Sequence, residues 1–405
     1  MGRKAIIHAG MPKTGSSAIQ AALRDLRCPT HEYLQLGRPN HSRLLNAAVG
    51  DHLRQPMMAD GLGANDLVEG RDDARRVLHD ALVAAQAPSI VISAEVLKNF
   101  SLGALRTFRD FMRDHVDGET VFAYVRGPLS KNESLLQQSL KTGFYKGLGR
   151  LDLPHEFLDR LIAVFGADNV RLLPFRRDLL LEGDVVRDFC AATGVPFAEV
   201  KPNTANESLS LEACAIPFVH GRHRAFQLGS PGSSYAYSRL VRFLRNFGQG
   251  KLRLHPAVLS EHSVLIRDSF DRVTPMLGVD LYDLDAEVPD DAIRHEDDLE
   301  RIARRVAPDF RAFVDDVQEV RGVSPRAISA AKEALGASDD LIEGVVRPID
   351  ALLFEAREEW RSRDEPAEDG RHASPGRSTD DSRPSGSPAT SISGRLITAL
   401  RRRDR

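Results

Sequence analysis

The N-terminal stretch Ile6–Gln20 constrains the fold more than any other part of this chain. An apolar run at Ala5–Ile7 is followed by a turn-rich segment around Gly10 and Gly15, and helix-forming residues begin at Ala18. This order predicts a strand, a loop and a helix. Such a loop leaves unpaired backbone N–H groups at the N-terminus of the helix, where they and the helix dipole attract a phosphate-like anion.

Apolar runs and amphipathic segments alternate through the rest of the first half of the chain. The first helix is expected to end near Arg27–Pro29, and the stretch from about His31 to Asp66 is interpreted as a loop or short-helix excursion. Three further strands are predicted at Ser89–Ser93, Glu119–Val125 and Asn169–Pro174, with helical patterns between them. The order predicts an α/β fold, a three-layer α/β/α arrangement with a doubly wound parallel sheet like that of P-loop nucleoside triphosphate hydrolases.

The second half of the chain is mostly helical in pattern. Residues 1–360 are expected to form one domain, with a nucleotide-binding core at 1–205 and a helical capping part at 206–360. Residues 361–390 contain no aromatic residue and no aliphatic residue larger than Ala, which predicts a disordered tail at 361–405. Apolar residues and arginines from Ile392 onward indicate a short basic helix with weak membrane-surface contact, and a solvated tail is the favoured alternative.

Composition excludes some partners and locations. The chain has 55 basic and 58 acidic residues and a net charge of −3, so nothing in its charge indicates nucleic acid as a partner. Its three cysteines have no C-x-x-C spacing, so we expect reduced thiols and a cytoplasmic location. We also expect no signal peptide and no membrane span. His220 and His223 lack an accompanying Cys or carboxylate pattern, so no metal site is expected. The oligomeric state cannot be read from the sequence.

The position of the loop lysine distinguishes two kinds of phosphate-binding loop. A Walker A loop carries Lys directly after its second Gly, where it reaches the β- and γ-phosphates. Here Ser16 follows Gly15, and the lysine of the loop is Lys13. This arrangement argues against ATP hydrolysis. The segment P-K-T-G-S-S at Pro12–Ser17 resembles the 5′-phosphosulfate-binding loop of sulfotransferases that use 3′-phosphoadenosine 5′-phosphosulfate, the sulfuryl donor.

That resemblance implies roles for individual residues of the loop. Lys13 would neutralise charge on the bridging oxygen of the donor as the sulfur–oxygen bond breaks. The backbone and hydroxyl groups of Thr14, Gly15, Ser16 and Ser17 would hold the 5′-phosphate. A loop that binds nothing is the plain alternative, because short motifs often mislead.

A second segment matches the same family. Sulfotransferases hold the 3′-phosphate of the donor with an Arg at a strand end and a Ser eight residues later, in the pattern R-x-P-x-x-x-x-x-S, and this chain has R-G-P-L-S-K-N-E-S from Arg126 to Ser134. An Arg fork suits a phosphate, and a Ser hydroxyl donates a further hydrogen bond. Many relatives have an aromatic residue where this chain has Leu136. A third, looser match is Asn206–Ser208, whose first interpretation is a helix N-cap.

Sulfuryl transfer needs a base that takes the proton of the acceptor hydroxyl. Glu95 is the first candidate, because it follows a predicted strand and carbohydrate sulfotransferases commonly use a glutamate. The alternative is that Glu95 pairs with a cation such as Lys98. His8, at the end of the first strand, is the second candidate, with a structural hydrogen bond as its alternative. Since ligands bind at the carboxyl ends of parallel strands, we expect Lys13, Glu95 and Arg126 to lie at one edge of the sheet.

The resemblance therefore predicts a sulfotransferase that moves a sulfuryl group from 3′-phosphoadenosine 5′-phosphosulfate to a hydroxyl of a carbohydrate or glycolipid acceptor, without a metal. We expect acceptor contacts in the segments Tyr145–Leu151 and Gly229–Ser238. Two other classes stay open. A P-loop kinase would use Glu95 or Asp178 as a Mg²⁺ ligand, and a non-catalytic module would bind the nucleotide without chemistry.

Overall fold

β1 (Lys4–Ala9) is the central strand of the sheet in the structure, a computed structural model that describes residues 2–51, 70–201, 208–223, 232–336, 338 and 340–364. It pairs in parallel with β3 (Ser89–Ala94) on one side and with β4 (Gly118–Val125) on the other. β2 (His31–Tyr33) and β5 (Val170–Pro174) form the edges, so that the order is β2-β3-β1-β4-β5. The predicted parallel α/β fold is confirmed.

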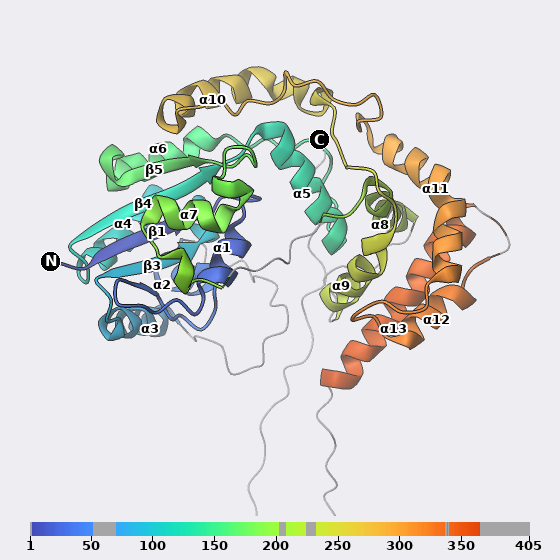
Figure 1. The fold of residues 1–405 in the computed structure, drawn as a ribbon, viewed down its shortest axis with the longest axis horizontal. Helices are drawn as coiled ribbons and strands as arrows, with labels where there is room; N and C mark the ends of the chain where they lie inside the picture. Colours follow the sequence, from blue (N-terminus) through green and yellow to red (C-terminus); the bar gives the residue numbers. More distant parts are fainter. Residues whose placement is uncertain are drawn as a thin grey trace, which may run out of the picture. The chain divides into compact units, whose positions relative to one another are not determined.

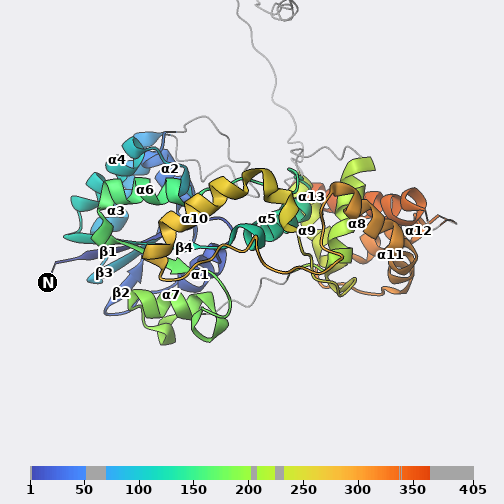
Figure 2. The same ribbon diagram turned by 90° about the horizontal axis from the view of Figure 1, so that it is seen from above.

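Helices cover both faces of the sheet (Figures 1 and 2). Because side chains alternate along a strand, Ile6 and Ile7 of β1 belong to two separate clusters of buried residues. The Ile6 side packs against α1 (Ser16–Leu23) and α7 (Val185–Thr193). The Ile7 side packs against four helices: α2 (Ser42–Val49), α3 (Arg71–Ala84), α4 (Leu102–Arg113) and α6 (Pro154–Phe165). These are the three layers expected from the sequence.

The segment after α1 differs from its prediction. The interpretation of His31–Tyr33 as a loop was wrong, because these residues form β2 and pair with β3. A strand of 3 residues is too short to show alternation in the sequence. α1 ends at Leu23 rather than near Arg27–Pro29, because the chain turns there, with the amide of Leu26 donating to the carbonyl of Leu23.

The second half of the described chain is mostly helical, as predicted. α5 (Pro128–Thr142) leaves the sheet after β4 and contacts α8 and α9. The helices that follow the sheet are α8 (Leu211–His223), α9 (Ser233–Phe243), α10 (Ser263–Leu277), α11 (Glu296–Asp316), α12 (Pro325–Glu333) and α13 (Arg347–Asp364). α10 packs against α6 and β5, so part of this half returns to the sheet.

Some predictions fall outside the described residues. Asn206, residues 229–231 of the Gly229–Ser238 segment, and the tail from residue 365 onward are not described. α13 continues past the predicted tail boundary at 361 and ends at Asp364. Among the helices of the described part of the chain, none has both the length and the apolar character that crossing a membrane requires.

Candidate functional site

The carboxyl ends of β1, β3 and β4 bring three predicted site residues to one edge of the sheet. Lys13 lies in the loop after β1, Glu95 opens the 3₁₀ helix η2 (Glu95–Asn99) after β3, and Arg126 follows β4. Gly10 shows how close the first two loops are. A Cβ added to Gly10 would lie 2.6 Å from Oγ of Ser16 and 2.8 Å from Cγ of Glu95.

The loop between β1 and α1 depends on Gly15. This residue has φ 78° and ψ 9°, a left-handed conformation that glycine adopts without strain, and it precedes the first turn of α1. A Cβ at this position would lie 2.8 Å from Cγ1 of Val185 and 3.1 Å from Cε2 of Phe175. The loop therefore needs glycine for its backbone conformation and for the close approach of its neighbours.

The polar side chains of the loop have different roles. Thr14 is buried and its hydroxyl donates to the carbonyl of Met11 at 2.7 Å, so this side chain holds the loop rather than facing a ligand. Ser16 is also buried, and Ser17 is exposed. Because the first N–H groups of a helix have no partner within the helix, the first turn of α1 supplies backbone donors at this point.

Lys13 and Arg126 are directly linked. Nη1 of Arg126 donates to the carbonyl oxygen of Lys13 at 2.9 Å, and the guanidinium of Arg126 lies over the ring of Phe175, 5.4 Å from its centroid. The ammonium of Lys13 donates to Oε1 of Gln138 at 3.3 Å. Lys13 itself has φ 66°, which is unusual for a residue other than glycine.

Burial shapes the electrostatics of the site. It lowers the pKa of Lys13, and the nearby cations Lys141 and Arg126 lower this pKa further, while Glu95 opposes the shift. Burial also raises the pKa of the Glu95 carboxyl, and Lys13 opposes that shift. Because the effect of burial is larger than that of Lys13, the Glu95 carboxylate is a stronger base than a carboxylate in water.

One face of α5 connects the two predicted nucleotide motifs. Ser130, Ser134 and Gln138 follow each other at i, i+4 spacing and lie on the same side of the helix. Nε of Arg126 lies 3.4 Å from Oγ of Ser130, and Gln138 holds Lys13. Ser134, half-buried, thus lies between the contacts of Arg126 and Lys13. Ser130 and Gln138 were not predicted, although their spacing from Ser134 was a usable signal.

The N-terminus of α5 is occupied by a residue from the second half of the chain. The carboxylate of Asp283 accepts the backbone N–H groups of Leu129 at 2.7 Å and Ser130 at 3.0 Å. A Cβ added to Gly127 would lie 2.4 Å from Oδ2 of Asp283. Asp283 therefore caps α5 in the way that an external anion would, and α1 offers the open helix N-terminus of the site.

His8 lies within the protein rather than at its surface. Its side chain is 0% exposed, its Nδ1 lies 2.8 Å from Oγ of Ser93, and its ring packs edge-on against Phe189 of α7. Burial lowers the pKa of His8 to about 4, so the imidazole is neutral at neutral pH. This placement favours the structural alternative for His8.

The structure also shows the surroundings of the residues that were named in the alternatives to a catalytic Glu95. Lys98 forms an ion pair with Asp152, whereas the cation that acts on Glu95 is Lys13. Asp178 is exposed and accepts from Nε of Arg176 at 2.9 Å. Within the described residues, no group of three or more His, Cys, Asp or Glu side chains is arranged to hold a metal ion.

Tyr145 begins the predicted acceptor segment. It donates to Oε1 of Glu296 at 2.7 Å and packs edge-on against Phe218 of α8. The start of this segment is therefore fixed against the helical half.

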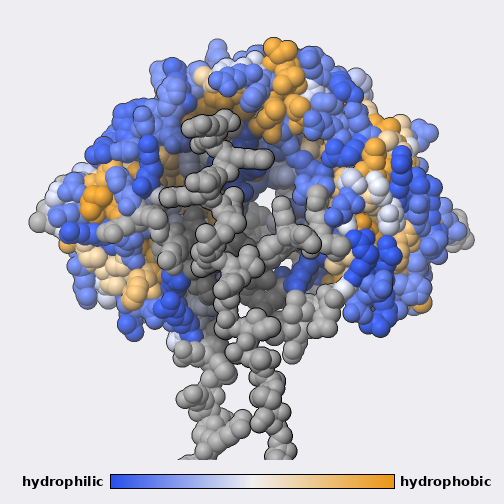
Figure 3. Space-filling view, turned by 180° about the vertical axis from the view of Figure 1, so that it is seen from behind, coloured by the Kyte–Doolittle hydropathy of each residue, from blue (hydrophilic) through white to orange (hydrophobic). Residues whose placement is uncertain are grey.

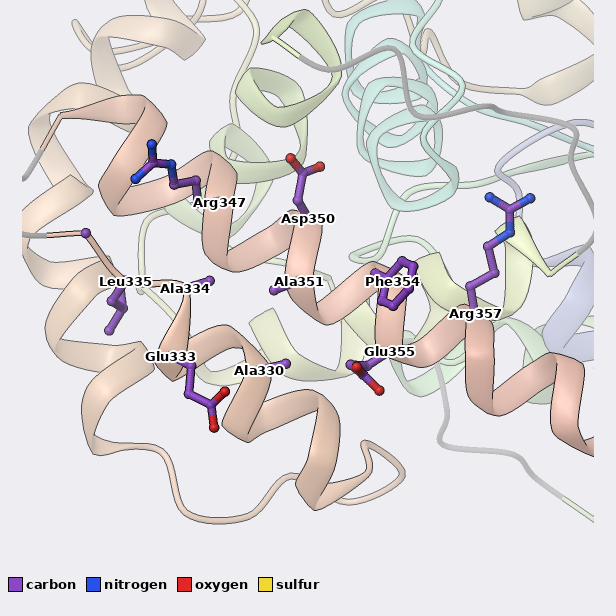
Figure 4. A pocket seen from close by; sticks show the side chains of 11 residues that line it. Ala330, Glu333, Ala334, Leu335, Arg347, Asp350, Ala351, Phe354, Glu355 and Arg357 are labelled. Atoms are coloured by element: carbon purple, nitrogen blue, oxygen red, sulfur yellow. The ribbon is translucent and has the colours of Figure 1, made fainter.

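Two other surface features lie apart from the loop. An open groove of about 720 Å³ runs between α12 and α13 (Figure 4). Two of its carboxylates are already engaged, since Asp350 contacts Nε2 of His220 at 2.8 Å and Glu355 pairs with Arg326 at 2.6 Å. On α10, Val264 and Leu265 are 72% and 52% exposed, and Figure 3 shows apolar groups at the top of that face. Neither feature brings together the groups that a transfer reaction needs.

Comparison with known proteins does not assign a family. No family model matches the chain, and no curated protein sequence matches it. The chain is similar to the crystal structure of a sulfotransferase from Alicyclobacillus acidocaldarius, with 14% identity and a TM-score of 0.40, over 69% of this chain and 98% of that one. This similarity is too low to show a family or an activity, and the fold assignment rests on the strand order.

Proposed function

We propose that this protein is a sulfotransferase that moves a sulfuryl group from 3′-phosphoadenosine 5′-phosphosulfate to a hydroxyl of a carbohydrate or glycolipid acceptor. One observation carries the proposal: Lys13, Glu95 and Arg126 come from three strand ends to the open N-terminus of α1. They supply a cation for the leaving group, a base for the acceptor and a guanidinium for a second phosphate.

The residues present fit such a donor. Gly10 and Gly15 leave no room for a Cβ, so the loop keeps its shape only with glycine at both positions, and this shape presents the N–H groups at the start of α1. Within the described residues, Arg126 contacts neutral groups, the carbonyl of Lys13, the hydroxyl of Ser130 and the ring of Phe175. The two carboxylates whose charges act on it have partners of their own, since Glu133 pairs with Arg253 and Asp283 caps α5. The charge of Arg126 is therefore available for a phosphate, and Ser134 lies one helical turn beyond Ser130 to donate a second hydrogen bond.

The reaction needs one bond to form and one to break. The acceptor oxygen attacks sulfur, the bond from sulfur to the 5′-phosphate oxygen breaks, and the acceptor proton passes to Glu95. The raised pKa of Glu95 makes this carboxylate a better proton acceptor. Negative charge that develops on the departing phosphate oxygen is stabilised by Lys13 and by the N–H groups of α1.

A P-loop kinase is the second candidate, and the position of Glu95 favours it. The Gly10 contacts place Glu95 next to the Ser16 hydroxyl, and a hydroxyl beside a carboxylate is a pair that can share Mg²⁺ in phosphoryl transfer. Against it stands the lysine position, since Ser16 occupies the place of the Walker A lysine.

Ligand-induced stabilisation separates these functions. A ligand that binds only the native state raises the melting temperature, with about 2.7 kcal/mol of added stability at 100 times Kd. We expect this from 3′-phosphoadenosine 5′-phosphate and not from ADP or ATP with Mg²⁺. Arg126→Gln should abolish the shift, whereas Arg171→Gln, at an exposed position of β5, should keep it. If ATP with Mg²⁺ stabilises the protein and the other two nucleotides do not, the sulfotransferase proposal is refuted and the kinase is favoured.

A further inference from the structure

Next to the candidate site, two lysines share one carboxylate. Lys98 of η2 and Lys131 of α5 both form ion pairs with Asp152, one on each carboxylate oxygen. Arg150, two residues before Asp152, lowers the pKa of both lysines through its charge, in addition to the larger effect of burial. Three cations are thus grouped around Asp152, and the charges of Arg160 and Glu156 also act on Lys98.

Lys98, Lys131, Arg150 and Asp152, which we call the cluster, are held in place by buried groups. The side chain of Asn132 links α5 to the backbone of Arg150. It accepts from the N–H of Arg150 at 2.7 Å, and its Nδ2 donates to the carbonyls of Arg150 at 3.2 Å and Pro128 at 2.9 Å. Asn132 is buried, and the side chain of Lys131 is 7% exposed. The backbone that carries Arg150 and Asp152 is therefore fixed relative to α5, which separates this arrangement from a chance group of surface lysines.

The excess of positive charge is costly without an additional anion. Burial lowers the pKa of Lys98 to about 8 and lowers that of Lys131 well below its usual value. One lysine would be enough to neutralise Asp152, and the charge of Glu156 on Lys98 is offset by that of Arg160. A second buried ammonium therefore loses hydration without gaining a counter-charge of its own. A structural ion pair alone does not explain the second lysine or Arg150.

The cluster adjoins both the reacting groups and Arg126, which lines the same internal gap and lowers the pKa of Lys131 through its charge. Glu95 and Lys98 are one turn apart on η2, and a 3₁₀ turn advances about 6 Å. A small internal gap is lined jointly by Thr14 of the phosphate loop and by Lys131, Arg150 and Asp152. Lys98 and Asp152 remain partly open to solvent and Arg150 is exposed, so an anion can reach them.

We propose that Lys98, Lys131 and Arg150 bind an oxyanion of the acceptor, so that the acceptor carries a carboxylate, sulfate or phosphate close to the hydroxyl that reacts at Glu95. The assignment of this anion to an acceptor rests on the proposed sulfotransferase function. The oxyanion position itself rests on the cluster alone. If this position binds the acceptor, the expected carbohydrate or glycolipid acceptors are those that carry an acidic group.

An anion titration tests the position directly. The full-length protein is saturated with 3′-phosphoadenosine 5′-phosphate, so that the phosphate loop is filled, and its melting temperature is followed with sodium sulfate, phosphate or acetate at constant ionic strength. We expect a saturable rise. Arg150→Gln and Lys98→Gln should each weaken the apparent anion affinity about 10- to 150-fold, because a hydrogen bond to a charged group is worth about 1.5–3 kcal/mol. Arg106→Gln, at an exposed position of α4, should leave it unchanged.

The outcomes separate this inference from the proposed function. A rise that does not saturate, or one that is equal in the wild type and both cluster variants, refutes the anion position. If the nucleotide itself gives no stabilisation, the donor site is refuted, while comparison of Arg150→Gln with Arg106→Gln still decides on the cluster. The best of the three anions indicates the acidic group. Faster sulfation of neutral glycans than of their acidic counterparts would refute the link to the acceptor.

Discussion

Replacing Gly15 with alanine tests the geometry of the phosphate loop against a matched position. Gly15 and Gly194 have nearly the same backbone conformation, with φ 78° and ψ 9° at the first and φ 77° and ψ 7° at the second. Their surroundings differ. A Cβ at Gly15 would lie 2.8 Å from Val185, whereas a Cβ at Gly194 would meet nothing within 4 Å.

The two variants should therefore lose different amounts of stability. Alanine in the left-handed region costs about 1–2 kcal/mol, and this cost applies equally to Gly15→Ala and Gly194→Ala. Forcing an extra carbon into a filled space adds about 1–3 kcal/mol, and this cost applies only at Gly15. We expect the free energy of unfolding of Gly15→Ala to lie below that of Gly194→Ala by about 1–3 kcal/mol, the second of these terms.

Urea unfolding of both variants and the wild type measures this difference, with equal m values as the check that the unfolded states are comparable. Nucleotide-induced stabilisation is measured on the same samples. Because the added methyl group would displace the loop from Val185, Gly15→Ala should also lose affinity for 3′-phosphoadenosine 5′-phosphate, and Gly194→Ala should not. Equal losses of stability in the two variants would show that the loop is not packed against α7 as described.

Three further predictions concern the titratable groups. Glu95→Gln should reduce the rate of sulfuryl transfer about 10²–10⁴-fold while nucleotide stabilisation stays unchanged, and activity close to that of the wild type would exclude Glu95 as the base. Lys13→Met should lower kcat, measured by single-turnover kinetics, more than it weakens nucleotide binding, because its charge acts mainly on the leaving group; the reverse pattern would make Lys13 a binding residue. Burial lowers the pKa of His8 to about 4 from 6.5, so the unfolded chain binds a proton there at higher pH than the native protein, and stability should fall as the pH drops from 6.5 towards 4. In His8→Gln, the free energy of unfolding should lose this part of its dependence on pH. An unchanged pH dependence would contradict the burial of His8.

The sequence predicted the parts of the fold and of the site that depend on local patterns. The strands that end before Gly10, Glu95 and Arg126 are compact apolar runs, and a parallel sheet necessarily places their carboxyl ends at one edge. The edge strand β2 was missed because its 3 residues are held by pairing with β3 and have no pattern of their own.

Contacts between distant segments were not predictable in the same way. Lys98 and Asp152 are 54 residues apart, and no spacing rule connects them. Leu129 and Asp283 are separated by 154 residues, and an aspartate in that connection has no local feature that marks it as a cap for α5. The sequence also could not distinguish a catalytic from a structural role for His8, because its burial depends on the packing of Phe189 of α7 against its ring.

The Asp283 cap has a consequence for dissecting the chain. The strand ends and the phosphate loop all lie within residues 1–205, which suggests a nucleotide-binding fragment that folds without the rest. Such a fragment would lack the carboxylate at the N-terminus of α5, the helix that carries Ser134, and would expose the surface of β5 that α10 covers. A truncation after residue 205 therefore removes the cap of the helix that carries Ser134, although Pro12–Ser17 and Arg126–Ser134 are both retained.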